Sequence, residues 1–159
     1  MIRVEDLALI EEIKQLKARY FRFCDTRDLE GYAALFTEDA KIDVRGAVSA
    51  GSDQPRAQAI SDFDNDRVII GGAAFVAFVS RITLPGTVSA HHGHMPEIEI
   101  LSPTTACGIW AMEDHIWFPP QAPYRSMHGY GHYHETYEKQ HDCWLIASMT
   151  LTRLKVELT

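Results

Sequence analysis

The spacing of apolar residues changes partway along the chain, and this change constrains the fold more than any other feature. In the first segment apolar residues recur every three or four positions, at Leu9, Ile13, Leu16, Tyr20 and Cys24, which predicts an amphipathic helix over residues 7–24. Its polar face is expected to carry Glu11, Glu12, Lys14 and Lys17. The same spacing predicts a shorter helix over residues 29–36. Beyond residue 86, segments rich in Val, Ile, Trp and Phe predict strands. Helices followed by antiparallel strands indicate an α+β fold rather than alternating βαβ units.

The remaining elements follow from local patterns. Residues 40–44 alternate apolar and charged side chains, which predicts a half-buried strand, and residues 72–82 predict a third helix. Between them, residues 46–66 are polar and small and predict a loop with a helical turn near residues 56–63. Five further strands are expected over residues 87–92, 97–101, 106–118, 127–139 and 143–158. We therefore expect a single domain over residues 1–159, with three helices packed on a strongly curved mixed or antiparallel sheet that forms a cone around a pocket.

Charge and cysteine content limit the partners and the compartment. The formal net charge is −7 over 159 residues, whereas nucleic acids and anionic membranes are bound through basic surfaces. Three cysteines without a C-x-x-C spacing indicate reduced thiols. The N-terminus lacks the pattern of a signal peptide, and the most apolar window, residues 68–79, is too short to span a bilayer. We expect a cytoplasmic protein with neither nucleic acid nor membrane as its partner.

Histidines and misplaced charges mark the candidate site. Seven of the eight histidines fall between residues 91 and 134, mostly on expected strands, where they are either ordinary surface and core residues or proton-transfer groups and metal ligands. Arg153 and Asp114 each continue an apolar strand face, so each lies either at the sheet rim or inside a cavity. Asp25 follows largely apolar helical residues. It either caps the next helix or holds a histidine as a general base.

Several segments together resemble a known family. Residues 13–25 and 35–40 resemble the opening of SnoaL-like proteins of the nuclear-transport-factor-2-like superfamily. Residues 88–100, 110–114 and 133–144 are most similar to the bile acid 7α-dehydratase branch. The resemblance implies an acid–base pair of Asp25 and His91, as in scytalone dehydratase and lindane dehydrochlorinase, and further pocket residues at Tyr20, Asp114 and Arg153. The chain departs from the family over residues 45–85, which help to line the pocket mouth.

The resemblance also implies a function. We expect a cofactor-independent lyase, a dehydratase, acting on a hydrophobic hydroxy-ketone of polycyclic or steroid-like character, with isomerase or polyketide cyclase activity left open. Large side chains favour such a ligand and give the expected substrate-binding residues Trp110, Met112, Phe118 and Tyr130. No metal site is expected. A homotrimer or homodimer is expected, because the outer face of such a sheet pairs between subunits in the family.

Two other interpretations remain open from the sequence. His92 and His94 followed by Glu99 have the spacing of a cupin metal site, and His132 and His134 form a second His-x-His on a strand. Against a cupin, the chain opens with two expected helices. The second alternative is a binding or assembly module of the same fold, which generally lacks the acid–base pair.

Overall fold

The computed structural model describes residues 4–48 and 68–159, and the expected loop with its helical turn near residues 56–63 lies largely outside them. The elements follow in the order α1 (Val4–Thr26), α2 (Leu29–Ala33), β1 (Phe36–Asp43), a 3₁₀ turn (Arg45–Val48), β2 (Ile69–Ile70), α3 (Gly72–Ile82), β3 (Val88–Ser102), β4 (Thr105–Trp117), β5 (Ser126–Gln140) and β6 (Cys143–Leu158). Within these two ranges, no helix has the length and apolar character needed to cross a membrane.

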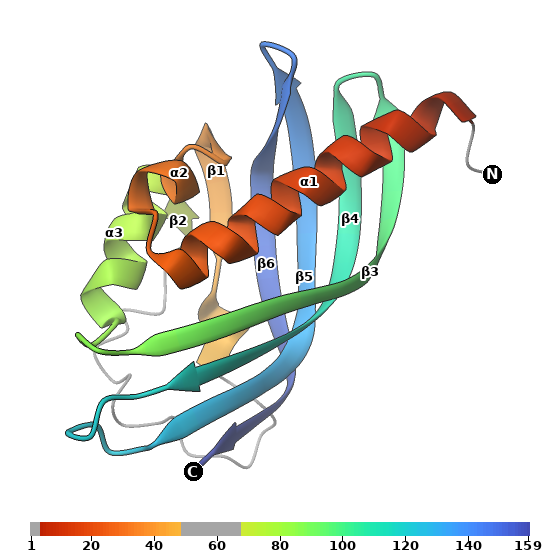
Figure 1. Cartoon of the computed structure of the whole chain (residues 1–159). Coiled ribbons are helices and arrows are strands. Elements are labelled where there is room, and N and C mark those ends of the chain that lie inside the picture. The colour runs from red at the N-terminus through yellow and green to blue at the C-terminus, as the bar shows by residue number, and fades with distance from the viewer. Residues whose placement is uncertain (1–3, 49–67) are drawn as a thin grey trace.

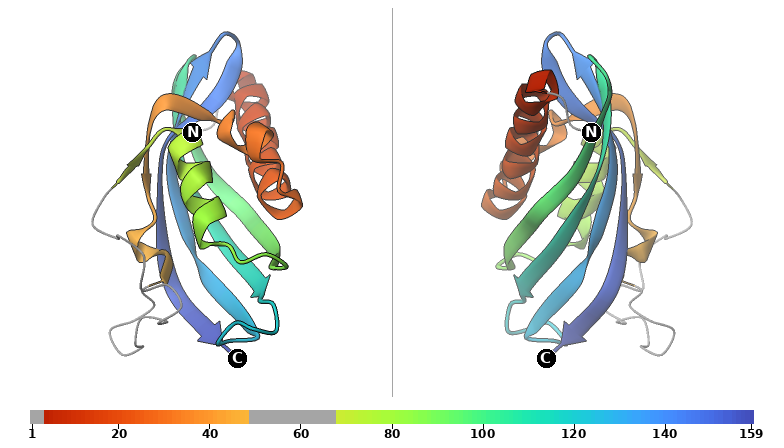
Figure 2. Two further views of the ribbon diagram at one scale, coloured as in Figure 1. Left: turned by 90° about the vertical axis from the view of Figure 1, so that its left-hand side faces the viewer. Right: turned by 90° about the vertical axis from the view of Figure 1, so that its right-hand side faces the viewer.

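The strands form one curved sheet in the order β2-β1-β6-β5-β4-β3 (Figure 1). β1 runs parallel to β6, while every other neighbouring pair is antiparallel. Figure 2 shows the three α-helices on one side of the sheet. α1 lies across the long strands and α3 lies beside β1 (Figure 1). The expected α+β class, with three helices on a curved mixed sheet, is confirmed.

The apolar stripe of α1 forms part of the core. Ile13, Leu16, Tyr20 and Cys24 are all buried against the sheet, as their spacing predicts. The helix ends at Thr26, and Arg27 then adopts a positive φ of 60°. The next residue, Asp28, caps α2 by accepting a hydrogen bond of 2.9 Å from the Gly31 N–H. Because Asp28 caps α2, Asp25 is available for another contact.

Two element boundaries differ from the sequence prediction. The second helix ends at Ala33, and Phe36 instead opens β1, where it is buried in the core. The two strands expected over residues 87–92 and 97–101 are one strand, β3, whose register against β4 shifts between Gly93 and Pro96. Proline has no N–H to donate to the ladder, and a bulge accommodates it without ending the strand.

The polar face expected for the first helix is wrong at one position. Lys17 is fully buried and pairs with the buried carboxylate of Glu135 on β5. The Glu135 carboxylate also accepts a hydrogen bond of 2.5 Å from the Tyr137 hydroxyl, which in turn accepts one of 2.8 Å from the Trp110 indole. The Lys17 ammonium also lies 3.7 Å from the centre of the Tyr133 ring. Lys17 follows Ile13 by four residues, so helical spacing places it on the buried stripe.

Candidate active site

A cavity of about 630 Å³ lies between the helices and the concave face of the sheet. Most of its walls are apolar side chains from α3, β4, β5, β6 and the segment after β4, among them Phe75, Phe78, Val79, Ile116, Phe118, Met127 and Leu151. Its polar lining includes the side chains of Cys24, which directly precedes Asp25, and of Ser89, His91, Asp114 and Arg153. A cavity of this size, with apolar walls and a few convergent polar groups, is typical of a small-molecule site.

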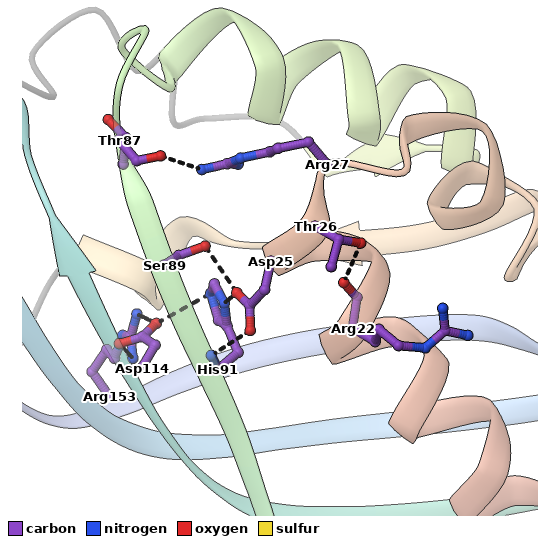
Figure 3. A network of polar contacts seen from close by, with 9 residues as sticks. All are labelled: Arg22, Asp25, Thr26, Arg27, Thr87, Ser89, His91, Asp114 and Arg153. Atoms are coloured by element: carbon purple, nitrogen blue, oxygen red, sulfur yellow. Dashed lines mark hydrogen bonds and ion pairs between the residues drawn. The ribbon is translucent and has the colours of Figure 1, made fainter.

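His91, which lines this cavity, forms a close pair with Asp25 behind it (Figure 3). The last turn of α1 brings Asp25 against β3, where its Oδ1 lies 2.6 Å from Nδ1 of His91. The carboxylate also accepts hydrogen bonds of 2.8 Å from the Ser89 hydroxyl and 2.8 Å from the His91 backbone N–H. Three donors therefore fix the carboxylate, which in turn fixes the orientation of the imidazole.

The pairing changes the protonation of both groups. Burial alone would lower the pKa of His91, but the hydrogen bond to Asp25, with contributions from Cys24 and Asp114, outweighs it and raises the pKa to about 10. Burial would raise the pKa of Asp25, yet the hydrogen bonds from His91 and Ser89 hold it below its ordinary value. The pair is therefore an imidazolium and a carboxylate at neutral pH.

Asp114 and Arg153 form a second buried pair across the strands. The Arg153 guanidinium donates hydrogen bonds of 3.0 and 2.6 Å to the two carboxylate oxygens of Asp114, and both side chains are only 3% exposed. Arg153 also donates to the Ala47 carbonyl at 2.9 Å. Gly129 lies opposite Asp114 on β5, and a Cβ there would come within 2.4 Å of both charged groups. Because glycine has no side chain, Gly129 leaves room for the ion pair.

The second nitrogen of His91 lies near the Asp114–Arg153 pair without bonding it. His91 Nε2 lies 3.9 Å from Oδ2 of Asp114, on the side of the ring away from Asp25. At this distance the two atoms make no hydrogen bond, so Nε2 can bond a ligand in the cavity instead. The site therefore presents one nitrogen held by a carboxylate and one nitrogen available for proton transfer.

Three tyrosines border the same cavity. Tyr20, Tyr32 and Tyr133 all line it, and the Tyr20 ring packs edge-on at 5.0 Å from Tyr32 and 5.7 Å from Tyr133. Burial raises the pKa of all three phenols well above 10, so they remain protonated hydrogen-bond donors. Of the three, only Tyr20 is expected at the site from the sequence. The helical spacing of Tyr32 and the strand alternation of Tyr133 mark both as buried but not as cavity residues.

The expected substrate-binding residues are only partly at the cavity. Phe118 lines it. Trp110 instead bonds Tyr137 in the core, and Met112 packs with its sulfur 3.4 Å from the Arg153 guanidinium, so neither lines the cavity. The placement of Tyr130 in the pocket is wrong: its hydroxyl bonds His128 at 3.2 Å and its ring stacks on that histidine, away from the cavity.

The histidine pairs considered as metal ligands lie elsewhere. His92 and His94 are exposed, and neither they nor Glu99 belong to a group of closely spaced ligand atoms among the described residues. One such group occurs in residues 4–48 and 68–159. It consists of Cys24, Asp25 and His91, whose ligand atoms lie within 4.8 Å of one another. The cupin spacing in the sequence thus does not correspond to a cupin-like cluster in this fold.

Comparisons with known proteins identify the family. Residues 5–150 match the SnoaL-like domain, so the chain belongs to the SnoaL-like family, within the nuclear-transport-factor-2-like superfamily. A candidate scytalone dehydratase from Novosphingobium aromaticivorans superposes with a TM-score of 0.73 at 19% identity, covering 96% of this chain and 88% of that one. The hexachlorocyclohexane dehydrochlorinase LinA-type3 from Novosphingobium barchaimii gives 0.70 at 14% identity, covering 98% and 93%.

A third similar structure differs in its described activity. A candidate aromatic ring hydroxylase from Novosphingobium aromaticivorans gives a TM-score of 0.75 at 18% identity, covering all of this chain and 96% of that one. At these identities the likeness shows the fold alone. The activity of this chain therefore has to be argued from its own cavity and side chains.

Proposed function

We propose that this protein is a cofactor-independent lyase, a dehydratase that removes water from a hydrophobic hydroxy-ketone by acid–base catalysis. The observation that carries the proposal is the Asp25–His91 pair, 2.6 Å apart at an apolar cavity of about 630 Å³. Enzymes for this chemistry need a positioned base, hydrogen-bond donors for a developing oxyanion and walls that exclude water.

His91 is the proposed base. His91 lines the cavity, and in the neutral imidazole its Nε2, the nitrogen that Asp25 does not hold, can take a proton from the carbon next to the ligand's carbonyl. Asp25, bonded to Nδ1, compensates the positive charge that the ring gains. Because the pKa of His91 is raised to about 10, the neutral form is about one part in a thousand at pH 7. We therefore expect kcat/KM to rise about tenfold per pH unit through the neutral range.

Other side chains of the site can interact with the carbonyl and hydroxyl oxygens of the ligand. A phenol of Tyr20, Tyr32 or Tyr133 can donate a hydrogen bond to the carbonyl oxygen as enolate charge develops, because all three stay protonated. The proton taken by His91 is then available to the hydroxyl that leaves from the neighbouring carbon. Arg153, held by Asp114, places a cationic group at the same cavity and favours a ligand with a carbonyl or carboxylate oxygen.

The walls support a large apolar ligand. Phenylalanines at 75, 78 and 118, together with aliphatic and methionine side chains, supply most of the lining, so a steroid or polycyclic skeleton is the preferred class. A binding or assembly module needs no acid–base pair beside its cavity, so the Asp25–His91 contact favours the enzyme over that alternative.

The test is a screen of hydroxy-ketosteroids and related hydroxy-ketones for loss of water, followed by mass spectrometry and by the ultraviolet absorption of the conjugated ketone. With a substrate in hand, His91→Ala should lower turnover by about 10²–10⁴-fold and leave affinity nearly unchanged. His92→Ala is the matched control, because His92 is the next residue on β3 and is exposed. Arg153→Ala should mainly weaken binding, and it should also lower stability because it leaves the buried Asp114 carboxylate unpaired.

Two results would contradict the proposal. Equal turnover in wild type and His91→Ala would show that His91 is not the base. Ligand binding without loss of water from any hydroxy-ketone would instead favour the binding module.

A further inference from the structure

The thiol of Cys24 lies at the proposed site but has no role in the proposed reaction. Cys24 precedes Asp25 in the last turn of α1, is 8% exposed and lines the cavity. Its Sγ lies with an Asp25 oxygen and a His91 nitrogen in a group whose atoms are all within 4.8 Å of one another. The Cys24 sulfur thus lies beside an imidazole, and Cys24 lines a cavity large enough for an organic ligand.

The surroundings of Cys24 differ from those of the other two cysteines. Cys107 lies partly buried on β4 and Cys143 is exposed at the start of β6, and neither lines the cavity. A thiol next to an imidazole is the arrangement that activates cysteine as a nucleophile, because the ring accepts the thiol proton or stabilises the thiolate as an imidazolium.

A metal ion is the other ligand that such a trio of residues can hold. Asp25, however, already accepts three hydrogen bonds, from Ser89, the His91 backbone and the His91 ring. A cation would have to replace the imidazole contact on Oδ1 to reach the carboxylate and the ring together. The existing bonds therefore favour an organic electrophile on Cys24 over a cation.

We propose that Cys24 is a nucleophilic thiol that adds to α,β-unsaturated ketones bound in the cavity. The proposal rests on the proposed function for its ligand class, since loss of water from a β-hydroxy-ketone produces such an enone in the same cavity. Cys24 would then form a thioether with the product or with a related enone and so hold it in the site.

The addition is balanced without any further reagent. The thiol proton leaves to His91 when the imidazole is neutral, or to water when His91 already carries a proton. The sulfur electron pair forms a bond to the β-carbon, and the electrons of the carbon–carbon double bond move towards the carbonyl oxygen as an enolate. The imidazolium then delivers a proton to the α-carbon. Nothing is oxidised or reduced, and the reverse steps release the enone and the thiol.

The experiment uses the wild-type chain and 2-cyclohexen-1-one as the probe. Adduct formation is followed at each cysteine by peptide mass spectrometry, with cyclohexanone as the control that lacks the double bond. Cys24 should react at least about tenfold faster than Cys143 although Cys143 is the exposed thiol, and cyclohexanone should give no adduct. A Cys24 that stays unmodified, or reacts only after denaturation, would overturn the proposal.

The variant arm tests the neighbouring imidazole. His91→Gln should slow adduct formation at Cys24 by at least about tenfold while the rate at Cys143 stays the same, which serves as the internal control. Equal Cys24 rates in wild type and variant would show an ordinary thiol and overturn the proposal. The comparison of Cys24 with Cys143 within the wild type decides the question even if the variant folds poorly. If adducts form at Cys24 but no hydroxy-ketone loses water, the proposed dehydratase activity is wrong and the nucleophilic thiol stands. If water is lost but no adduct forms at Cys24, the proposed nucleophilic thiol is wrong and the dehydratase activity stands.

Discussion

The protonation of His91 gives a sharp test of the site that needs no substrate. Asp25→Asn keeps the shape of the side chain and removes its charge. In the wild type the pKa of His91 is about 10, compared with an ordinary 6.5, and the side chain is only 13% exposed. A difference of about 3.5 pH units corresponds to about 5 kcal/mol of preference for the charged ring in the folded state, as an upper value. Without the carboxylate, the pKa of His91 should fall well below 10, because burial lowers it and the largest opposing contribution, the hydrogen bond to Asp25, is weakened.

The raised pKa also predicts how stability depends on pH. A histidine whose pKa is higher in the folded than in the unfolded chain contributes its full stabilisation below about pH 6.5. That contribution is lost between about pH 6.5 and 10, as the folded protein gives up the proton. The free energy of unfolding of the wild type should therefore exceed that of Asp25→Asn most clearly near pH 6, and the difference should shrink towards pH 10.

Two measurements check this prediction. Nuclear magnetic resonance of the imidazole groups gives the titration of His91 in both proteins, with assignment by His91→Gln. Urea unfolding at pH 6, 8 and 10 gives the free energies, and subtracting the variant from the wild type removes the other groups that titrate in this range. A wild-type His91 that titrates near pH 6.5, or a stability difference that is constant from pH 6 to 10, would refute the reasoning.

Two further predictions concern the fold and the assembly. Lys17→Met should lower the free energy of unfolding by about 3–5 kcal/mol in urea, because it leaves the Glu135 charge buried and unpaired, whereas Lys14→Met at a side chain 44% exposed should cost less than about 1 kcal/mol. A loss below about 1 kcal/mol for Lys17→Met would contradict the buried pair. Light scattering should show a homodimer or homotrimer, and Ile109→Glu on the exposed outer face of β4 should shift it to monomer. A wild type found only as an 18.0 kDa species at micromolar concentration would contradict the oligomer.

The sequence predicts the helices, the strands and the unusually placed charged residues better than it predicts which residues those charges contact. Spacing of apolar residues is a local property, so it identifies α1, α3, β4, β5 and β6 within a few residues of their ends, whereas it divides β3 into two strands. Asp25, Asp114 and Arg153 each interrupt an apolar pattern, which is why the sequence alone singles them out. Their partners cannot be derived from local spacing, because Asp25 and His91 are separated by 66 positions and meet only through the packing of α1 on β3.

The errors have physical reasons as well. Lys17 has the spacing of a buried residue, but its charge is typical of the surface, and only the pairing with Glu135 makes its burial possible. Tyr130 is expected in the pocket for its size. The inward side chains of β5 alternate through Met127 and Tyr133, which places Tyr130 on the opposite face. Trp110 does face the inner side of the sheet, but it packs into the polar network with Tyr137 and away from the cavity.

The buried charged groups Lys17 and His91 differ in whether their contacts leave an atom able to bond a ligand. Lys17 is paired with Glu135 and packed between aromatic rings, and Glu135 accepts a further bond from Tyr137, so neither residue reaches the cavity. Such a network stabilises one arrangement of helix and sheet and leaves nothing for a ligand. His91 lines the cavity and is bonded to Asp25 through one nitrogen, while its other nitrogen lies 3.9 Å from the Asp114 carboxylate. A buried ionisable group with one nitrogen held by a carboxylate and the other making no hydrogen bond to Asp114 is suited to transferring a proton. This difference supports the proposed role of His91 as the base and a structural role for Lys17.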